Sequence, residues 1–268
     1  MKKKIFFWAR IIIIVYCLIG ILIYYFQEKL IFHPEILAKN HQFNFPFAFK
    51  EVNIPYNEQS TINIVQFLPA DSVVKGVVLY FHGNGQNISK YAPHAPLFTK
   101  NNYEVWMIDY PGYGKSTGEL TEKTLYDWAM VFYKLARARF PKDKIILYGR
   151  SLGTGIASQL ASVRDCKAVL LEAPYYSLAS LAATKAPIYP VIQMMRYEFP
   201  TWKYLQEVTA PVIIFHGTND ELIPISQSKR LKPFLKKNDE LIPVENAGHN
   251  NVMYYESYAK KLDSILQH

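Results

Sequence analysis

The sequence has almost no cysteine. It holds two, Cys17 and Cys166, among 268 residues, and Cys17 lies inside a long apolar run near the N-terminus. A disulfide between the two is therefore not expected. No CxxC pair or Cys/His cluster occurs in the sequence, so we expect no structural zinc site. Cysteine usage leaves the cellular compartment undecided.

A basic stripe is also missing, although the net charge is +8. Lys2, Lys3, Lys4 and Arg10 supply half of that charge, and the remainder holds 26 basic against 22 acidic side chains. No basic run interleaved with aromatics occurs in this remainder, so nucleic acid is not an expected partner. Half of the residues are apolar and 19% are charged, which is typical of a globular chain with a buried core.

Residues 5–26 are almost wholly apolar, with Arg10 as their only charge. A helix of this length spans about 33 Å, close to the roughly 30 Å of a bilayer's hydrocarbon core. We predict a basic tail over residues 1–4 and an uncleaved transmembrane anchor over 5–26. A cleaved signal peptide is the main alternative, but residues 24–28 offer no small-x-small cleavage site. The positive-inside rule places the N-terminus in the cytoplasm and the catalytic domain on the non-cytoplasmic side, periplasmic or lumenal.

After a connector over residues 27–48, the chain alternates between apolar, β-branched runs and helical patterns. The predicted strands are 50–54, 62–67, 77–81, 105–109, 144–148, 168–172, 212–215 and 241–244. The last six are continuous apolar runs, as expected of parallel strands covered on both faces, and the first two indicate an antiparallel hairpin at the edge. The clearest helical patterns are 126–139, 152–162, 227–236 and 254–266. The alternation predicts an α/β domain over 49–268, with a doubly wound, mostly parallel sheet of about eight strands.

The segment 174–209 interrupts this rhythm. It is far longer than the ~2–6 residues that usually connect elements of α/β units, and it combines an Ala/Leu helix with prolines, Met194, Met195 and Trp202. We interpret it as a small apolar helical cap over the site. Two surface helices with ordinary packing faces are the alternative.

Residues 149–153 match the pattern G-x-S-x-G, with Ser151 at its centre. The pattern alone is weak, but here a predicted strand precedes it and a predicted helix follows. This is the strand-turn-helix context of a nucleophile elbow. The flanking glycines permit a sharp turn that holds the serine above the carboxyl edge of the sheet. Ser151 is therefore the predicted nucleophile.

A serine nucleophile needs a base, and the base needs a partner that orients it. In this fold the chain order is serine, acid, histidine. Asp220 follows the strand at 212–215, and His249 follows the strand at 241–244. We predict Asp220 as the acid and His249 as the base. Glu221 is expected to point elsewhere, and His216 is expected to be a packed residue at a strand end.

The loop after the strand at 77–81 has the sequence His82-Gly83-Asn84-Gly85. Acyl transfer requires backbone donors for the developing oxyanion, from this first loop and from the residue after the nucleophile. We predict that the N–H groups of Asn84 and Leu152 form this oxyanion hole. His82 is expected to be a structural hydrogen-bonding residue.

Together these motifs resemble those of the α/β-hydrolase superfamily over residues 50–268. The runs 80–85, 109–116, 149–153 and 248–250 are similar to those of its single-pass abhydrolase-domain branch, often labelled serine aminopeptidase-like. The apolar N-terminal run followed by Lys-Leu-Ile-Phe-His-Pro at 29–34 also resembles that branch. The resemblance implies hydrolysis through a triad but does not identify the substrate. Because Ser151 stands where dehalogenases and epoxide hydrolases carry Asp, those reactions are disfavoured.

We therefore expect a membrane-anchored hydrolase of carboxylic esters or thioesters that acts on a lipid or an acylated small molecule or protein. A peptidase selecting free N-termini is the first alternative, and it needs acidic groups near the site, for which Glu198 and Glu207 are available. A hydrolase-like scaffold that binds a partner without catalysis is the second. No metal or organic cofactor is expected, because a triad and an oxyanion hole suffice for hydrolysis.

Overall fold

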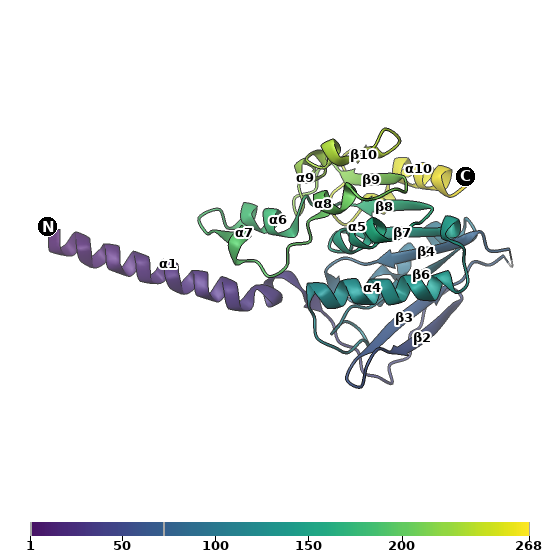
Figure 1. The fold of residues 1–268 in the computed structure, drawn as a ribbon, viewed down its shortest axis with the longest axis horizontal. Helices are drawn as coiled ribbons and strands as arrows, with labels where there is room; N and C mark the ends of the chain where they lie inside the picture. Colours follow the sequence, from purple (N-terminus) through teal and green to yellow (C-terminus); the bar gives the residue numbers. More distant parts are fainter. Residues whose placement is uncertain (1, 72, 268) are drawn as a thin grey trace.

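The computed structural model describes residues 2–71 and 73–267. One long helix, α1 (Lys2–Ile31), extends away from an α/β domain that contains the other elements (Figure 1). The helix includes Lys2–Lys4 and continues past residue 26, so residues 2–4 of the predicted tail and the first residues of the predicted connector are helical. Residue 1 of the tail lies outside the described residues. Gln27, Glu28 and Lys29 are good helix formers. The helix ends just before His33, which Pro34 restricts to an extended conformation.

The domain is built on one sheet of eight strands in the order β10-β9-β8-β7-β4-β6-β3-β2. Their bounds are β2 (Phe49–Pro55), β3 (Thr61–Phe67), β4 (Gly76–Phe81), β6 (Tyr103–Ile108), β7 (Ile145–Arg150), β8 (Ala168–Glu172), β9 (Val212–Gly217) and β10 (Glu240–Val244). β3 is antiparallel to both β2 and β6, and the other neighbours are parallel. The predicted sheet and the antiparallel hairpin at its edge are confirmed.

Three of the four predicted helices are confirmed as α4 (Glu122–Arg137), α5 (Gly153–Val163) and α10 (Glu256–Gln267). Thr121 caps α4, because its side chain accepts a hydrogen bond from the backbone N–H of Thr124. The prediction of one helix over 227–236 is wrong. There, α9 (Ser226–Lys229) ends early and a 3₁₀ turn (Lys232–Phe234) follows, because Pro233 has no N–H and its ring obstructs a continuous helix.

The remaining helical segments are short, and of these only the Ala/Leu helix expected within 174–209, now α6, was predicted individually. They are α2 (Ile88–Tyr91), α3 (Pro96–Thr99), α6 (Leu178–Lys185), α7 (Val191–Met194), α8 (Thr201–Leu205) and 3₁₀ turns at Ala92–His94, Lys142–Lys144 and Val252–Tyr254. Prolines such as Pro93 and Pro96 interrupt the hydrophobic period that identifies a longer helix.

Helices cover both faces of the sheet. Along β4, Val77, Leu79 and Phe81 pack into one cluster with side chains of α4, α5 and α8. Val78 and Tyr80 pack into a second cluster with side chains of α2, α3 and α10. Successive side chains of a strand point to opposite faces, and this explains why β4 carries no charged side chain on either face.

The segment predicted as a cap, 174–209, divides into two parts. α8 packs beside α5 in the layer over the sheet, with Thr201 and Leu205 buried. α6 and α7 instead project from the domain beside the C-terminal half of α1 (Figure 1). Only the α6–α7 part is therefore placed to cover a site at the sheet's edge.

The chain after α1 is tied to the loop after β4. β1 (His33–Pro34) pairs in parallel with β5 (Gly85–Gln86). A second tie joins this segment to the loop after β6, because the backbone N–H of Leu37 donates to the carbonyl of Gly114. Two-residue strands carry no detectable hydrophobic period, so this small sheet was not predicted. It fixes the exit of α1 close to the carboxyl edge of the main sheet.

Candidate active site

Ser151 lies in the tight turn between β7 and α5, with a backbone φ of 51°. Few residues other than glycine adopt this left-handed conformation, and where they do, strain is often stored at a functional site. A Cβ at Gly149 would meet the carbonyl oxygen of Gly153 at 2.6 Å, and one at Gly153 would meet that of Phe81 at 2.0 Å. The two glycines are therefore required by close backbone packing on either side of the serine.

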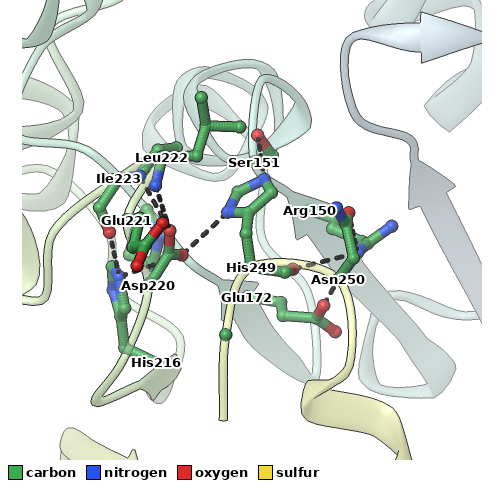
Figure 2. A network of polar contacts seen from close by, with 12 residues as sticks. Arg150, Ser151, Glu172, His216, Asp220, Glu221, Leu222, Ile223, His249 and Asn250 are labelled. Carbon is green, nitrogen blue, oxygen red and sulfur yellow. Dashed lines mark hydrogen bonds and ion pairs between the residues drawn. The ribbon is translucent and has the colours of Figure 1, made fainter.

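The three residues predicted as a triad come together at the carboxyl ends of β7, β9 and β10. His249 Nε2 lies 3.1 Å from Ser151 Oγ, and His249 Nδ1 lies 2.7 Å from Asp220 Oδ2. Figure 2 shows the imidazole between the serine and the carboxylate. With Nδ1–H donating to Asp220, Nε2 is free to accept the serine proton. This is the arrangement that activates a serine hydroxyl.

Asp220 is held in place by several donors. Its Oδ1 accepts from the backbone N–H groups of Leu222 and Ile223, at 3.0 and 2.8 Å. Burial favours a higher pKa for this carboxyl, but contacts from His216 and His249 outweigh burial and hold the pKa of Asp220 below its ordinary value. Asp220 is therefore a stable anion, as the partner of an imidazolium must be. The neighbouring Glu221 is exposed.

His216 is a packed residue at the end of β9, in agreement with the sequence interpretation. It is fully buried, its Nε2 donates to the carbonyl of Ile223 at 2.7 Å, and its Nδ1 lies 2.6 Å from Ser228 Oγ. Its Nε2 is also 3.5 Å from Asp220 Oδ2. His216 thus supports the turn that carries the acid, and the sequence did not reveal this contact.

Asn84 and Leu152, whose backbone N–H groups are the predicted oxyanion donors, both line the space above Ser151. Within the part of the chain that the structure describes, neither N–H donates to a protein acceptor. The Asn84 loop is held from outside by His33, whose backbone N–H donates to Asn84 Oδ1 at 3.1 Å, and by Tyr113, whose hydroxyl donates to the Asn84 carbonyl at 2.9 Å. An oxyanion hole requires donors that are not engaged elsewhere, and the assignment of this role to Asn84 and Leu152 stays a prediction.

A buried ion pair lies directly beneath the elbow. Arg150 Nε is 2.7 Å from Glu172 Oε1, and the Arg150 guanidinium also donates to the His249 carbonyl at 3.1 Å and to Asn250 Oδ1 at 3.2 Å (Figure 2). Burial favours a higher pKa for Glu172, but the Arg150 charge outweighs it and lowers that pKa. This role of Arg150 was not predicted from the sequence. A charged residue at the end of an otherwise apolar strand was the available signal.

An apolar cleft of about 370 Å³ opens above Ser151. Residues of α1, of the two loops beside Ser151, of the α6–α7 segment and of the turn after Asp220 line it: Ile23, Gln27, Leu30, Ile31, Asn84, Ser151, Leu152, Tyr175, Leu178, Leu181, Ala182, Lys185, Ala186, Val191, Met195, Leu222 and Ile223. Lys185 is the single charged side chain in this lining. Glu198 and Glu207, considered for binding an amino terminus, are exposed and lie outside it. Such a lining suits an uncharged chain better than an ammonium group.

Among the described residues, no group of three His, Cys, Asp or Glu side chains is arranged to hold a metal ion.

Comparisons with known proteins identify similar chains. A family model described as serine aminopeptidase, S33, matches residues 72–203. This range includes the elbow at Ser151 but ends before Asp220 and His249. The chain is 33% identical over 197 residues to alpha/beta hydrolase domain-containing protein 17C of Xenopus tropicalis, covering 71% of this chain and 61% of that protein. It is 32% identical to the Homo sapiens protein of the same description, covering 71% and 58%. The chain thus spans about three fifths of the length of these curated relatives.

Solved structures resemble the whole domain. An esterase of Pyrococcus furiosus superposes with a TM-score of 0.68 at 17% identity, covering 88% of this chain and 98% of that one. An alpha-beta hydrolase of Vibrio vulnificus superposes with a TM-score of 0.66 at 21% identity, covering 81% of each. These similarities confirm the fold predicted from the sequence.

Proposed function

The chain belongs to the α/β-hydrolase superfamily, and from this premise we propose that it is a membrane-anchored serine hydrolase of carboxylic esters or thioesters. The observation that carries the proposal is the continuous hydrogen-bonded relay from Ser151 through His249 to Asp220, with contacts of 3.1 and 2.7 Å. A relay of this geometry, buried beneath an apolar cleft, is expected to activate the serine at neutral pH.

In the proposed reaction, Ser151 Oγ attacks the acyl carbonyl while His249 Nε2 takes its proton. The carbonyl oxygen becomes an oxyanion that accepts from the N–H groups of Asn84 and Leu152. His249 then gives the proton to the departing alcohol or thiol, which leaves an ester on Ser151. A water molecule, deprotonated by His249, cleaves this acyl-enzyme and restores the serine. Asp220 keeps the imidazole in the required tautomer and stabilises its charged form.

The cleft supports an acyl substrate over a peptide with a free amino terminus. Its lining is apolar apart from a few groups near Ser151 and at its outer end, and no carboxylate among the described residues contributes to it. An ammonium group would enter such a site unpaired, at a substantial desolvation cost. An alkyl chain gains about 0.8 kcal/mol for each buried CH₂. The proposed substrate is therefore a lipid, or a small molecule or protein that carries an acyl chain.

Membrane anchoring through α1 is the second part of the proposal. Its most apolar 18 residues have a mean hydropathy of 2.6, and their side chains are not buried in the domain. Lys2, Lys3 and Lys4 precede this stretch. By the positive-inside rule the N-terminus is then cytoplasmic and the domain lies on the non-cytoplasmic side.

An activity-based fluorophosphonate tests the catalytic proposal. We expect it to modify Ser151 in the detergent-solubilised full chain, with the site identified by mass spectrometry, and to leave Ser151→Ala unmodified. Thr154→Ser, in the first turn of the same helix, is a matched control that should be labelled like the wild type.

A screen of esters, thioesters and aminoacyl amides then follows with the same preparations. Turnover of aminoacyl amides but not of esters would show that the chain is a peptidase and not an esterase. Folded protein that is never labelled would indicate a non-catalytic scaffold.

A further inference from the structure

The loop between α6 and α7 packs against the middle of α1. The rings of Tyr16 and Tyr189 stack with their centroids 4.6 Å apart. The Tyr16 hydroxyl donates to the Ile188 carbonyl at 2.9 Å, and the Tyr189 hydroxyl donates to the Tyr16 carbonyl at 3.2 Å. Gly20 allows close approach, since a Cβ there would lie 3.3 Å from the Tyr189 ring. The contact is thus a specific one between the loop and the apolar helix.

This contact has a defined depth if α1 spans a bilayer. A hydrocarbon core of about 30 Å that begins at Ile5 ends near residue 25, at 1.5 Å per residue. Tyr16 and Gly20 then lie about 14 and 8 Å inside the boundary nearest the domain. The loop that touches them must lie at the same depth. It cannot remain in water while α1 crosses the membrane.

The composition of the loop fits that depth. Residues 186–195, which we term the cap tip, contain no charged side chain and are bracketed by Lys185 and Arg196. Ile188 and Ile192 are 70% and 58% exposed, an unfavourable placement in water for branched apolar side chains. The structure describes no other element that covers them. Hydrocarbon is the environment in which their exposure carries no cost.

The polar groups mark the level of the membrane surface. Arg196 pairs with Glu28 at 3.4 Å, its backbone N–H donates to Gln27 Oε1 at 2.7 Å, and the Tyr197 hydroxyl contacts Glu28 Oε1 at 3.1 Å. Gln27 and Glu28 follow residue 25, so these contacts fall at the headgroup layer. Charged groups at both ends of the cap tip can remain there while the residues between them enter the hydrocarbon.

We infer that the cap tip inserts into the leaflet beside the domain, so that the cleft above Ser151 opens to the hydrocarbon between α1 and α6. Ile23, Leu30 and Ile31 of α1 form one wall of the cleft, and Leu181, Val191 and Met195 belong to the opposite wall. An acyl chain reaches Ser151 laterally from the bilayer, without crossing water. The inference rests on the anchoring part of the proposed function and specifies where the substrate enters.

Depth-dependent fluorescence quenching tests the insertion. Ile188→Cys in a Cys17→Ser background is labelled with an environment-sensitive NBD dye in detergent and reconstituted into phosphatidylcholine vesicles with or without doxyl-labelled lipid. Cys166 can remain, because it is only partly exposed and burial raises the pKa of its thiol to about 12, which slows its labelling. The Cys17→Ser chain without a new cysteine measures the remaining background. Val73→Cys is the matched control: Val73 is 72% exposed and precedes β4, at the end of the sheet opposite Ser151.

We expect the dye at residue 188 to emit at shorter wavelength than the dye at residue 73 and to be quenched by doxyl lipid, while the dye at 73 is not. The wild-type chain labelled at Cys17 reports whether α1 itself lies in lipid. Quenching at 17 without quenching at 188 overturns the inference and leaves the anchor intact. The dye at residue 188 could emit at short wavelength without quenching by doxyl lipid, and lose this short-wavelength emission at a high lipid-to-protein ratio. That result indicates contact with a second copy and also overturns the inference.

Activity provides an independent measurement. Ile188→Asp/Ile192→Asp places two carboxylates in the cap tip, outside the residues that line the cleft. We expect at least a tenfold loss in hydrolysis of a long-chain ester embedded in vesicles, and no loss for a short soluble ester, since each charge in hydrocarbon is costly. Equal rates of the wild type and the double variant on the embedded ester would contradict insertion of the cap tip. Fluorophosphonate labelling of Ser151 in the same vesicles shows separately whether the catalytic proposal holds.

Discussion

The regions on the two sides of Ser151 are built from different interactions. Beneath it, buried charged and polar groups hold one another at hydrogen-bonding distance, from Arg150 and Glu172 to Asp220 and His216. Above it, the walls of the cleft are apolar side chains from α1, α6 and α7. Hydrogen bonds are directional, whereas apolar contact is not. Under the proposed function, the lower region therefore fixes the atoms of the reaction, and the upper region selects substrates by shape and length.

The two regions also differ in how they are assembled. The polar groups follow consecutive parallel strands, so the sheet alone brings them to one edge. The cleft forms only where α1 packs against a segment more than 150 residues later in the chain, through contacts such as the stacking of Tyr16 on Tyr189. Substitutions in the lower region should thus affect chemistry and folding for every substrate. Substitutions in the upper region should affect some substrates and not others.

The largest expected effect comes from Asp220→Asn. The amide cannot enforce the His249 tautomer with a proton on Nδ1, so we expect kcat for every ester to fall by about 10⁴-fold. Steady-state hydrolysis of a short soluble ester measures it. Asp263→Asn, which alters contacts with Lys100 and Asn101 far from Ser151, should leave kcat unchanged. If kcat of Asp220→Asn fell by less than about tenfold, another acid such as Glu221 would have to orient His249.

Arg150→Met should have its main effect on stability. It leaves Glu172 buried without its cation, and we expect the free energy of unfolding to fall by about 3–5 kcal/mol. Arg150→Met/Glu172→Leu removes both charges and should recover most of that loss. Its kcat should remain below the wild-type value, because the His249 carbonyl and Asn250 still lack their donor.

Denaturant unfolding and ester hydrolysis, measured on the same preparations, separate these two roles of Arg150. Lys142→Met, which breaks an exposed pair with Asp165, is the control and should change neither quantity. Full recovery of kcat in the double variant would show that the ion pair stabilises the fold without positioning His249.

His94→Gln should change the response of the domain's stability to acid. Burial lowers the pKa of His94 from its ordinary value near 6.5 to about 4. Between these two values the unfolded chain binds a proton that the folded chain does not, so folding loses stability as the pH falls through this window. The loss amounts to about 3 kcal/mol at most, since one pKa unit corresponds to about 1.36 kcal/mol.

Free energies of unfolding between pH 7 and 4 measure this effect. The variant should show a smaller decrease than the wild type over that range, whatever its stability at pH 7. Identical pH profiles would mean that the folded protein accepts a proton on His94, which lies 2.8 Å from the Tyr80 hydroxyl.

The closeness of Ser151, Asp220 and His249 could be predicted from the sequence because a parallel sheet converts chain order into position. Ser151, Asp220 and His249 each follow an apolar strand, and such strand ends meet at one edge. The Arg150–Glu172 pair was not predicted, since only the register of β7 with β8 places the two residues opposite each other. A pairing of this kind has no signature along the chain.

The upper region was predicted only in outline. The apolar run at 5–26 and the segment 174–209 were both recognised, but nothing in either sequence indicated that they touch. The contact depends on the length of α1 beyond residue 26 and on the β1–β5 pairing that fixes its exit. The division of the cap also escaped prediction, because α8 is too short to show a period. Apolar surfaces carry no pattern that identifies their partner.

The smallest expected effect distinguishes the upper region from the lower. Ala182→Leu adds three carbons to the wall of the cleft that α6 forms. Since each buried CH₂ contributes about 0.8 kcal/mol, or about fourfold, we expect kcat/KM to fall about tenfold or more for the longest acyl chains that the wild type accepts. The shortest esters should be unaffected, because they do not reach that wall.

A series of p-nitrophenyl esters of increasing acyl length measures this shift. Thr184→Leu, on the same helix but exposed and outside the cleft lining, should give the wild-type length profile. An equal loss at every length in Ala182→Leu would mean that the substitution disturbs the relay around Ser151. A change confined to long chains would show that α6 sets acyl length independently of the chemistry beneath it, as two separately built regions require.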